Sequence, residues 1–67
     1  MKLKLNGEEH RLSAGASIPD VLGILGFEAA RGVAVAVDGE VVPRSEWGEF
    51  ALSDGMRVEV LRAVQGG

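Results

Sequence analysis

Three Asn-Gly or Asp-Gly dipeptides divide this chain into short segments and limit how it can fold. The first, Asn6-Gly7, follows a stretch in which Met1, Leu3 and Leu5 alternate with two lysines. Alternation with a period of two is typical of a strand that buries one face. Because both turn residues tolerate positive φ, the pattern predicts a type I′ hairpin turn and an antiparallel return strand through residues 10–12.

Two further turn signals occur in the second half of the chain. Residues 33–37 alternate valine with alanine and end at Asp38-Gly39, and residues 41–42 begin a short return strand that Pro43 ends. Asp54-Gly55 then leads into residues 57–64, where valines alternate with charged residues. The second half therefore predicts two or three more strands, the last of them over 57–64.

A single short helix is predicted between the two groups of strands. Ser17 is a favourable N-cap, Asp20 occupies the capping-box position, and Gly26 is a suitable C-cap. Between the caps, apolar residues recur at helical spacing on one face: Ile18, Val21, Leu22 and Leu25. Gly23 is unfavourable inside a helix, and the sequence leaves open whether it permits close packing on the sheet or is simply tolerated.

The order of two strands, one helix and two or three strands is typical of an α+β fold of the β-grasp type, as in ubiquitin. In this arrangement a mixed sheet of four to five strands packs on one main helix. With 67 residues the chain supports one small core and has no room for an enclosed active site. We expect one domain over residues 1–64 and a flexible C-terminal tail over residues 65–67.

The residue inventory argues against an enzyme. The chain has no cysteine and one histidine, so it lacks the groups for a disulfide, a thiolate metal site or a catalytic triad. His10 is expected to be structural or solvated, and Trp47 is expected to cover the small core rather than anchor a partner. Neither nucleotide-binding glycine motif follows a predicted strand. We therefore expect no metal and no cofactor bound by this chain.

Charge and hydropathy point to protein partners. The formal net charge is −3 and the basic residues are scattered, which argues against nucleic-acid binding. Lys2 and Lys4 are followed by polar residues rather than an apolar stretch, so we expect neither a signal peptide nor a membrane segment. These features favour a cytoplasmic protein.

The tail Gln65-Gly66-Gly67 directly follows the last predicted strand. Two glycines make the tail thin enough to enter a narrow channel. The carboxylate of Gly67 is an anion at neutral pH and a poor electrophile, so chemistry there requires activation, for example as an acyl adenylate. A sulfur nucleophile would then leave a thiocarboxylate. Because the chain has no thiol, the terminal carboxyl of Gly67 is the natural covalent site if this protein carries sulfur.

Along nearly its whole length the chain resembles the ThiS family, the sulfur carriers of thiamine biosynthesis. The resemblance rests on residues 1–8 (MKLKLNGE), residues 35–47 (VAVDGEVVPRSEW), and the ending from Asp54-Gly55 to Gln65-Gly66-Gly67. It implies a carrier that acts as a co-substrate and is not itself an enzyme, with Gly67 as the modified residue and Gln65 and Gly66 as the residues that thread the tail into a partner. It also implies three partners: a ThiF-like adenylating enzyme that uses ATP and magnesium, a sulfur donor such as a cysteine desulfurase, and a ThiG-like thiazole synthase.

Leu61 and Ala63 are predicted to form an exposed apolar docking patch, because they have the opposite parity from the core-facing Val58 and Val60. Three other functions stay open from the residues alone. The first is a carrier like the small subunit of molybdopterin synthase, and the second is a ubiquitin-like modifier joined to lysines of target proteins. The third is a β-grasp interaction module whose tail has no role.

Overall fold

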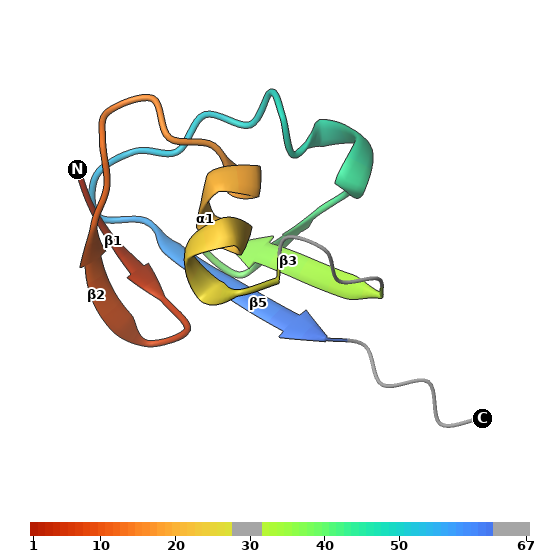
Figure 1. Cartoon of the computed structure of the whole chain (residues 1–67). Helices are drawn as coiled ribbons and strands as arrows, with labels where there is room; N and C mark the ends of the chain where they lie inside the picture. The colour runs from red at the N-terminus through yellow and green to blue at the C-terminus, as the bar shows by residue number, and fades with distance from the viewer. Residues whose placement is uncertain (28–31, 63–67) are drawn as a thin grey trace.

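The computed structural model describes residues 1–27 and 32–62, and the tail residues together with Ala63 lie outside this part. Five strands, one α-helix and one 3₁₀ turn are described there (Figure 1). In chain order they are β1 (Lys2–Leu5), β2 (Glu8–Arg11), α1 (Ile18–Leu25), β3 (Val33–Val37), β4 (Glu40–Val42), η1 (Arg44–Glu46) and β5 (Arg57–Arg62). The order agrees with the predicted β-grasp arrangement.

The five strands form one mixed sheet in the order β2-β1-β5-β3-β4, so the last strand of the chain occupies its centre. β1 and β5 run parallel, while the other three neighbouring pairs are antiparallel. The helix α1 packs across one face of this sheet (Figure 1). The prediction of a mixed sheet on one helix is therefore confirmed.

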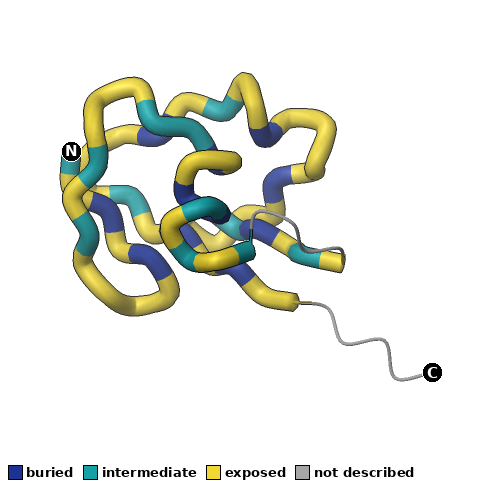
Figure 2. The backbone as a smooth tube through the Cα atoms, viewed as in Figure 1, coloured by how far each residue is buried: buried dark blue, intermediate teal, exposed yellow. Residues whose placement is uncertain are grey.

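The core lies between α1 and the sheet, where the inward side chains of β1, β3, β4 and β5 meet the apolar face of the helix. Figure 2 marks the buried positions along the backbone. The buried residues are Leu3, Leu5, Ile18, Val21, Leu22, Val35, Val37, Val42, Trp47, Leu52, Val58 and Val60. No polar or charged side chain is buried within residues 1–27 and 32–62. This single thin layer is the whole hydrophobic core of the described part. A chain of only 67 residues is expected to have a core of this limited size.

The caps of α1 are those the sequence predicts. The backbone N–H of Ser17 donates to Asp20 Oδ2 at 2.9 Å, and the Ser17 hydroxyl donates to the same oxygen at 3.1 Å. Gly26 ends the helix with φ +82°, a left-handed conformation that glycine adopts without strain. A Cβ placed on Gly23 would meet nothing within 4 Å, so this glycine is tolerated and not required by close packing on the sheet.

Trp47 covers the core beside β4, as predicted. Its side chain is 8% exposed, and its indole N–H donates to the Val42 carbonyl at 2.8 Å. The Arg44 guanidinium lies 5.1 Å from the ring centroid on the outside. The indole is thus held by apolar packing on one side and by a hydrogen bond at its polar edge.

The hairpin turns also follow the prediction. Asn6 and Gly7 both have positive φ, at +52° and +87°, and Asp38 and Gly39 have +50° and +85°. These values are those of type I′ turns. The Asp54-Gly55 turn packs instead on the first strand: the N–H of Lys2 donates to Asp54 Oδ1 at 2.6 Å, and the N–H of Gly55 donates to the Lys2 carbonyl at 2.7 Å.

Candidate functional site: the outer face of the sheet

The tail follows the central strand β5 after two further residues. β5 ends at Arg62, which pairs with Val33 at the start of β3. Gln65, Gly66 and Gly67 follow three to five residues later, outside the described residues, so their predicted roles stay predictions. Arg62 therefore marks the point on the described surface from which the tail continues.

The side chains of β5 point alternately to the two faces of the sheet along the whole strand. Val58 and Val60 are 0% and 2% exposed on the helix side, whereas Leu61 is 67% exposed on the opposite side. The predicted exposure of Leu61 is thus confirmed, and β5 has no bulge that would invert it. Ala63, the other residue of the predicted patch, lies outside the described residues.

The side of the sheet turned away from α1, here called the outer face, is defined by the same alternation on each strand and by the strand register. Its residues are Lys2, Lys4, Glu9, Arg11, Ala34, Ala36, Val41, Arg57, Glu59 and Leu61. They separate into an apolar part toward β4 and the end of β5, and a charged part over β2, β1 and the start of β5.

The apolar part of the outer face lies next to the end of β5. Leu61 is directly opposite Ala34, and Ala36 is directly opposite Val41, which is 74% exposed. The two alanines between the larger side chains keep this surface low and flat. These four residues, here called the apolar strip, form a hydrophobic surface close to the point where the tail begins.

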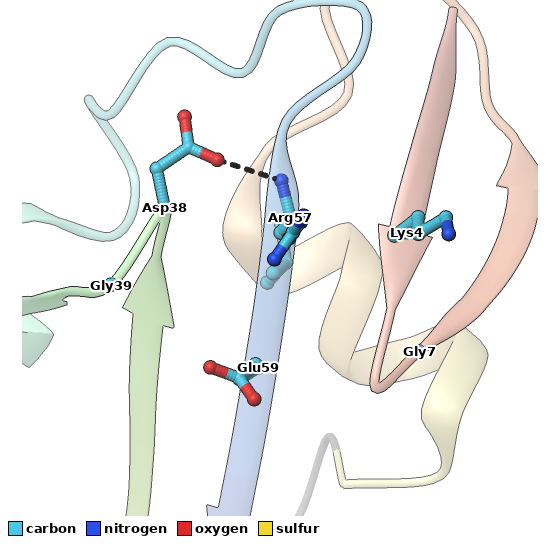
Figure 3. A pocket seen from close by; sticks show the side chains of 7 residues that line it. Lys4, Gly7, Asp38, Gly39, Arg57 and Glu59 are labelled. Atoms are coloured by element: carbon cyan, nitrogen blue, oxygen red, sulfur yellow. Dashed lines mark hydrogen bonds between the residues drawn. The ribbon is translucent and has the colours of Figure 1, made fainter.

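The charged part of the outer face surrounds the beginning of β5. Lys4 and Arg57 are direct partners in the parallel β1–β5 ladder, and Glu59 follows on the same face of β5. They line an open hollow of about 740 Å³ between the two type I′ turns (Figure 3). Asp38 borders this hollow, and its Oδ1 accepts a hydrogen bond from the Arg57 backbone N–H at 2.9 Å.

One contact at the end of β5 was not foreseen from the sequence. The Arg62 guanidinium lies 5.3 Å from the centroid of the Phe27 ring, which follows the helix C-cap. A cation over an aromatic face is attracted by the ring quadrupole. The contact joins the last described residue of β5 to the helix layer, and only the three-dimensional arrangement brings these two residues together.

The described residues contain no group of three or more His, Cys, Asp or Glu side chains placed to hold a metal ion. His10 lies in β2 opposite Leu3, partly buried, with its Nε2 3.9 Å from a Glu8 carboxylate oxygen. Within the same part of the chain, no helix is long and apolar enough to cross a membrane. The features of the described surface that suit protein docking are the apolar strip and the charged hollow.

Comparison with known proteins gives matches that span the chain. The model of the ThiS family matches residues 3–67. The chain is 40% identical over 67 residues to a protein named thiazole synthase from Paramagnetospirillum magneticum, and it spans 20% of that relative's length. It is 27% identical to the sulfur carrier protein ThiS of Escherichia coli, where the match covers 100% of both chains.

A solved structure has the same fold over its full length. The crystal structure of the thiamine biosynthesis protein ThiS from Geobacter metallireducens superimposes with a TM-score of 0.79 and 31% sequence identity. The superposition covers 100% of both chains. The β-grasp fold expected from the order of turns, strands and helix is therefore also the fold of a similar protein of known structure.

Proposed function

Because this chain belongs to the ThiS family, we propose that it carries sulfur for thiazole formation in thiamine biosynthesis, as a thiocarboxylate on Gly67. The observation that supports this most directly is the family match through residue 67, which includes the Gln65-Gly66-Gly67 tail. The fold adds that β5, the central strand, precedes this tail and contributes Leu61 to the exposed apolar strip of the outer face.

The proposed chemistry has two steps. A Gly67 carboxylate oxygen attacks the α-phosphate of ATP, with magnesium in the activating partner, so that an acyl adenylate forms and pyrophosphate leaves. A sulfide or persulfide sulfur then attacks the acyl carbon and AMP leaves. Sulfide gives the thiocarboxylate directly, whereas a persulfide gives an acyl disulfide that a thiol reductant must cleave. The chain supplies only the acyl group, so it acts as a co-substrate.

The tail is proposed to deliver the reacting carbon to partner active sites. Three extended residues span roughly 10 Å, at about 3.3–3.6 Å each. Gln65 and Gly66 would occupy the channel of the partner while Gly67 reaches the nucleotide. Glycine suits this because a backbone without Cβ atoms fits a narrow passage and adopts φ values that other residues avoid.

The apolar strip is proposed to dock the partner that receives the tail. The side chains of Leu61 and Val41 are largely exposed on the outer face. Leu61 belongs to β5, the strand that precedes the tail. Burial of this surface by a partner would fix the domain while the tail reaches inward. Ala63 would extend the strip if the alternation of β5 continues to that position.

Three partners follow from this proposal: a ThiF-like adenylating enzyme, a sulfur donor such as a cysteine desulfurase, and a ThiG-like thiazole synthase. The last has support from the comparisons, because a protein named thiazole synthase contains a segment 40% identical to this chain. The proposal places all of these reactions in the cytoplasm and assigns no catalytic residue to the carrier.

A single-turnover transfer experiment tests the function and separates the two closest carrier pathways. The thiocarboxylated chain, labelled with ³⁵S, is mixed with purified thiazole synthase and its other substrates, or with the large subunit of molybdopterin synthase and its precursor. We expect label in the thiazole product and none in molybdopterin. Label only in molybdopterin would replace the proposed acceptor, and isopeptide conjugates to protein lysines would support a modifier instead.

A further inference from the structure

Lys4 and Arg57 place two positive charges side by side on the outer face. They are direct partners in the parallel β1–β5 ladder, and both are exposed. Neither forms an ion pair within residues 1–27 and 32–62, whereas Lys2, one pleat away on β1, lies 3.9 Å from a Glu9 carboxylate oxygen. Like charges that are directly opposite in a sheet lower its stability. Lys4 and Arg57 thus repel each other across the β1–β5 ladder, while Glu9 lies directly opposite Lys4 on its other side, in β2.

The two cations line the hollow between the Asn6-Gly7 and Asp38-Gly39 turns (Figure 3). Two acidic residues border the same hollow, but neither forms an ion pair with the cations in the described structure. Asp38 accepts the backbone N–H of Arg57, and Glu59 lies one pleat further along β5. The hollow therefore presents unpaired cationic donors at a defined place.

We propose that this hollow binds a carboxylate side chain, from an aspartate or glutamate of the adenylating enzyme that receives the tail. The inference rests on the proposed carrier function. A guanidinium offers paired donors that match the two oxygens of a carboxylate, and an adjacent ammonium adds a point charge. Arg57 and Lys4 together supply this combination. Binding the anion would also relieve the repulsion between them.

The position of the site relative to Leu61 defines the complementary surface. Arg57 and Leu61 lie on the same face of β5, four residues apart, which corresponds to about 13 Å at roughly 3.3 Å per residue. The partner would thus present an acidic residue about 13 Å from an apolar pocket. An apolar contact with charged groups at its rim is a common arrangement of protein–protein interfaces.

The surroundings of the cations favour a protein over a nucleic acid. Asp38 and Glu59 flank the pair, and the whole chain carries a net charge of −3. A run of phosphates would meet these two carboxylates, whereas a single acidic side chain needs to contact only Lys4 and Arg57. Nucleic-acid binding also draws on several Lys and Arg contacts along the backbone. The local charge pattern thus suits one carboxylate.

The test compares Lys4→Gln and Arg57→Gln with Lys2→Gln as the matched control. Lys2 shares strand, face and charge with Lys4, but it does not line the hollow. With the purified adenylating enzyme, each hollow variant should raise KM about tenfold at low salt and leave kcat unchanged, as expected when one charge-assisted hydrogen bond is lost. Lys2→Gln should change KM by less than about twofold.

Two further measurements distinguish a carboxylate site from a general effect of charge. The double variant Lys4→Gln/Arg57→Gln should raise KM by less than the product of the single effects, because both residues hold the same group. Thermal unfolding of the two single variants and the double variant should show a repulsive coupling between Lys4 and Arg57, and this cycle cancels the contribution of Glu9, which lies directly opposite Lys4 on β2. An attractive coupling, or none, would contradict the repulsive pair from which the inference begins.

Other results would overturn the proposal. Equal effects of all three single variants would indicate long-range attraction, and no effect would remove the site. A short DNA duplex that competes with the adenylating enzyme for the wild-type chain, but not for Lys4→Gln or Arg57→Gln, would assign the hollow to nucleic acid. If the wild-type chain is adenylated but the variants behave normally, only this inference fails. If the wild-type chain is never adenylated, the carrier function fails, and this inference fails with it.

Discussion

The Asn6 side-chain oxygen accepts a hydrogen bond from the Val60 backbone N–H at 2.7 Å, across 54 positions of the sequence. The Asn6 backbone N–H in turn donates to the Val58 carbonyl at 2.9 Å. β1 leaves β5 at this point to enter its hairpin turn, and the asparagine side chain takes the place of the next strand residue. Asn6 therefore combines a turn conformation with a hydrogen bond to the central strand.

Replacing Asn6 should separate these two contributions. Asn6→Gly retains positive φ but loses the side-chain hydrogen bond, and should lower the free energy of unfolding by about 1 kcal/mol. Asn6→Ala also places an alanine at φ +52°, and should lower it by about 2 kcal/mol. Urea denaturation followed by circular dichroism measures both. Equal stability of the two variants would contradict the strain at this turn.

Leu61 and Val60 are adjacent in β5, but Leu61 is exposed and Val60 is buried. The same substitution at each position therefore separates an effect on binding from an effect on folding. Leu61→Asp should weaken binding to the adenylating enzyme roughly tenfold, while unfolding changes by no more than about 0.5 kcal/mol. Val60→Asp should prevent folding, because an unpaired charge would enter the core. Titration calorimetry and thermal melts report the two effects. A folded, tightly binding Leu61→Asp chain would remove the apolar strip as a docking surface.

Trp47 should stabilise the fold through its indole N–H as well as its volume. Trp47→Phe leaves the Val42 carbonyl without this donor, and should lower the free energy of unfolding by about 1–3 kcal/mol. Arg44→Ala removes only the cation over the ring, and should cost at most about 1 kcal/mol. Circular dichroism is the suitable probe, because the first variant lacks tryptophan. The reverse ranking would mean that the stacked arginine matters more than the hydrogen bond.

Deleting Gly67 should abolish adenylation and leave stability unchanged. The truncated chain still ends in a glycine carboxylate, but that group is withdrawn by about 3.3–3.6 Å, the length of one extended residue. Among the described residues, the buried core extends no further along the chain than Val60, seven residues before Gly67. Pyrophosphate release and thermal melting measure the two properties. Normal adenylation of the truncated chain would mean that reach does not limit the reaction.

The parts of the fold that depend on near neighbours in sequence could be predicted. The caps of α1 depend on Ser17 and Asp20, three residues apart, and the type I′ turns depend on adjacent residues. The exposure of Leu61 followed from a period of two along one strand, because β5 contains no bulge. Each of these predictions needed only local backbone geometry.

The parts that depend on strand neighbours could not be predicted from local pattern. Neither the hydrogen bond from Val60 to Asn6 nor the pairing of Lys4 with Arg57 follows from sequence spacing, because both require β1 to lie parallel to β5. The Arg62 contact with Phe27 has the same origin. The carrier chemistry came from the tail and the resemblance, and the cation pair became visible only in the sheet.

The most direct test of the proposed carrier function is the intact mass of the chain after incubation with a ThiF-like adenylating enzyme, ATP, magnesium and a sulfur source. Fragmentation then locates any change. We predict a gain equal to the replacement of one oxygen by sulfur, confined to Gly67. An unchanged mass, with an enzyme shown to be active on another carrier, would contradict the proposal that this chain carries sulfur on its tail.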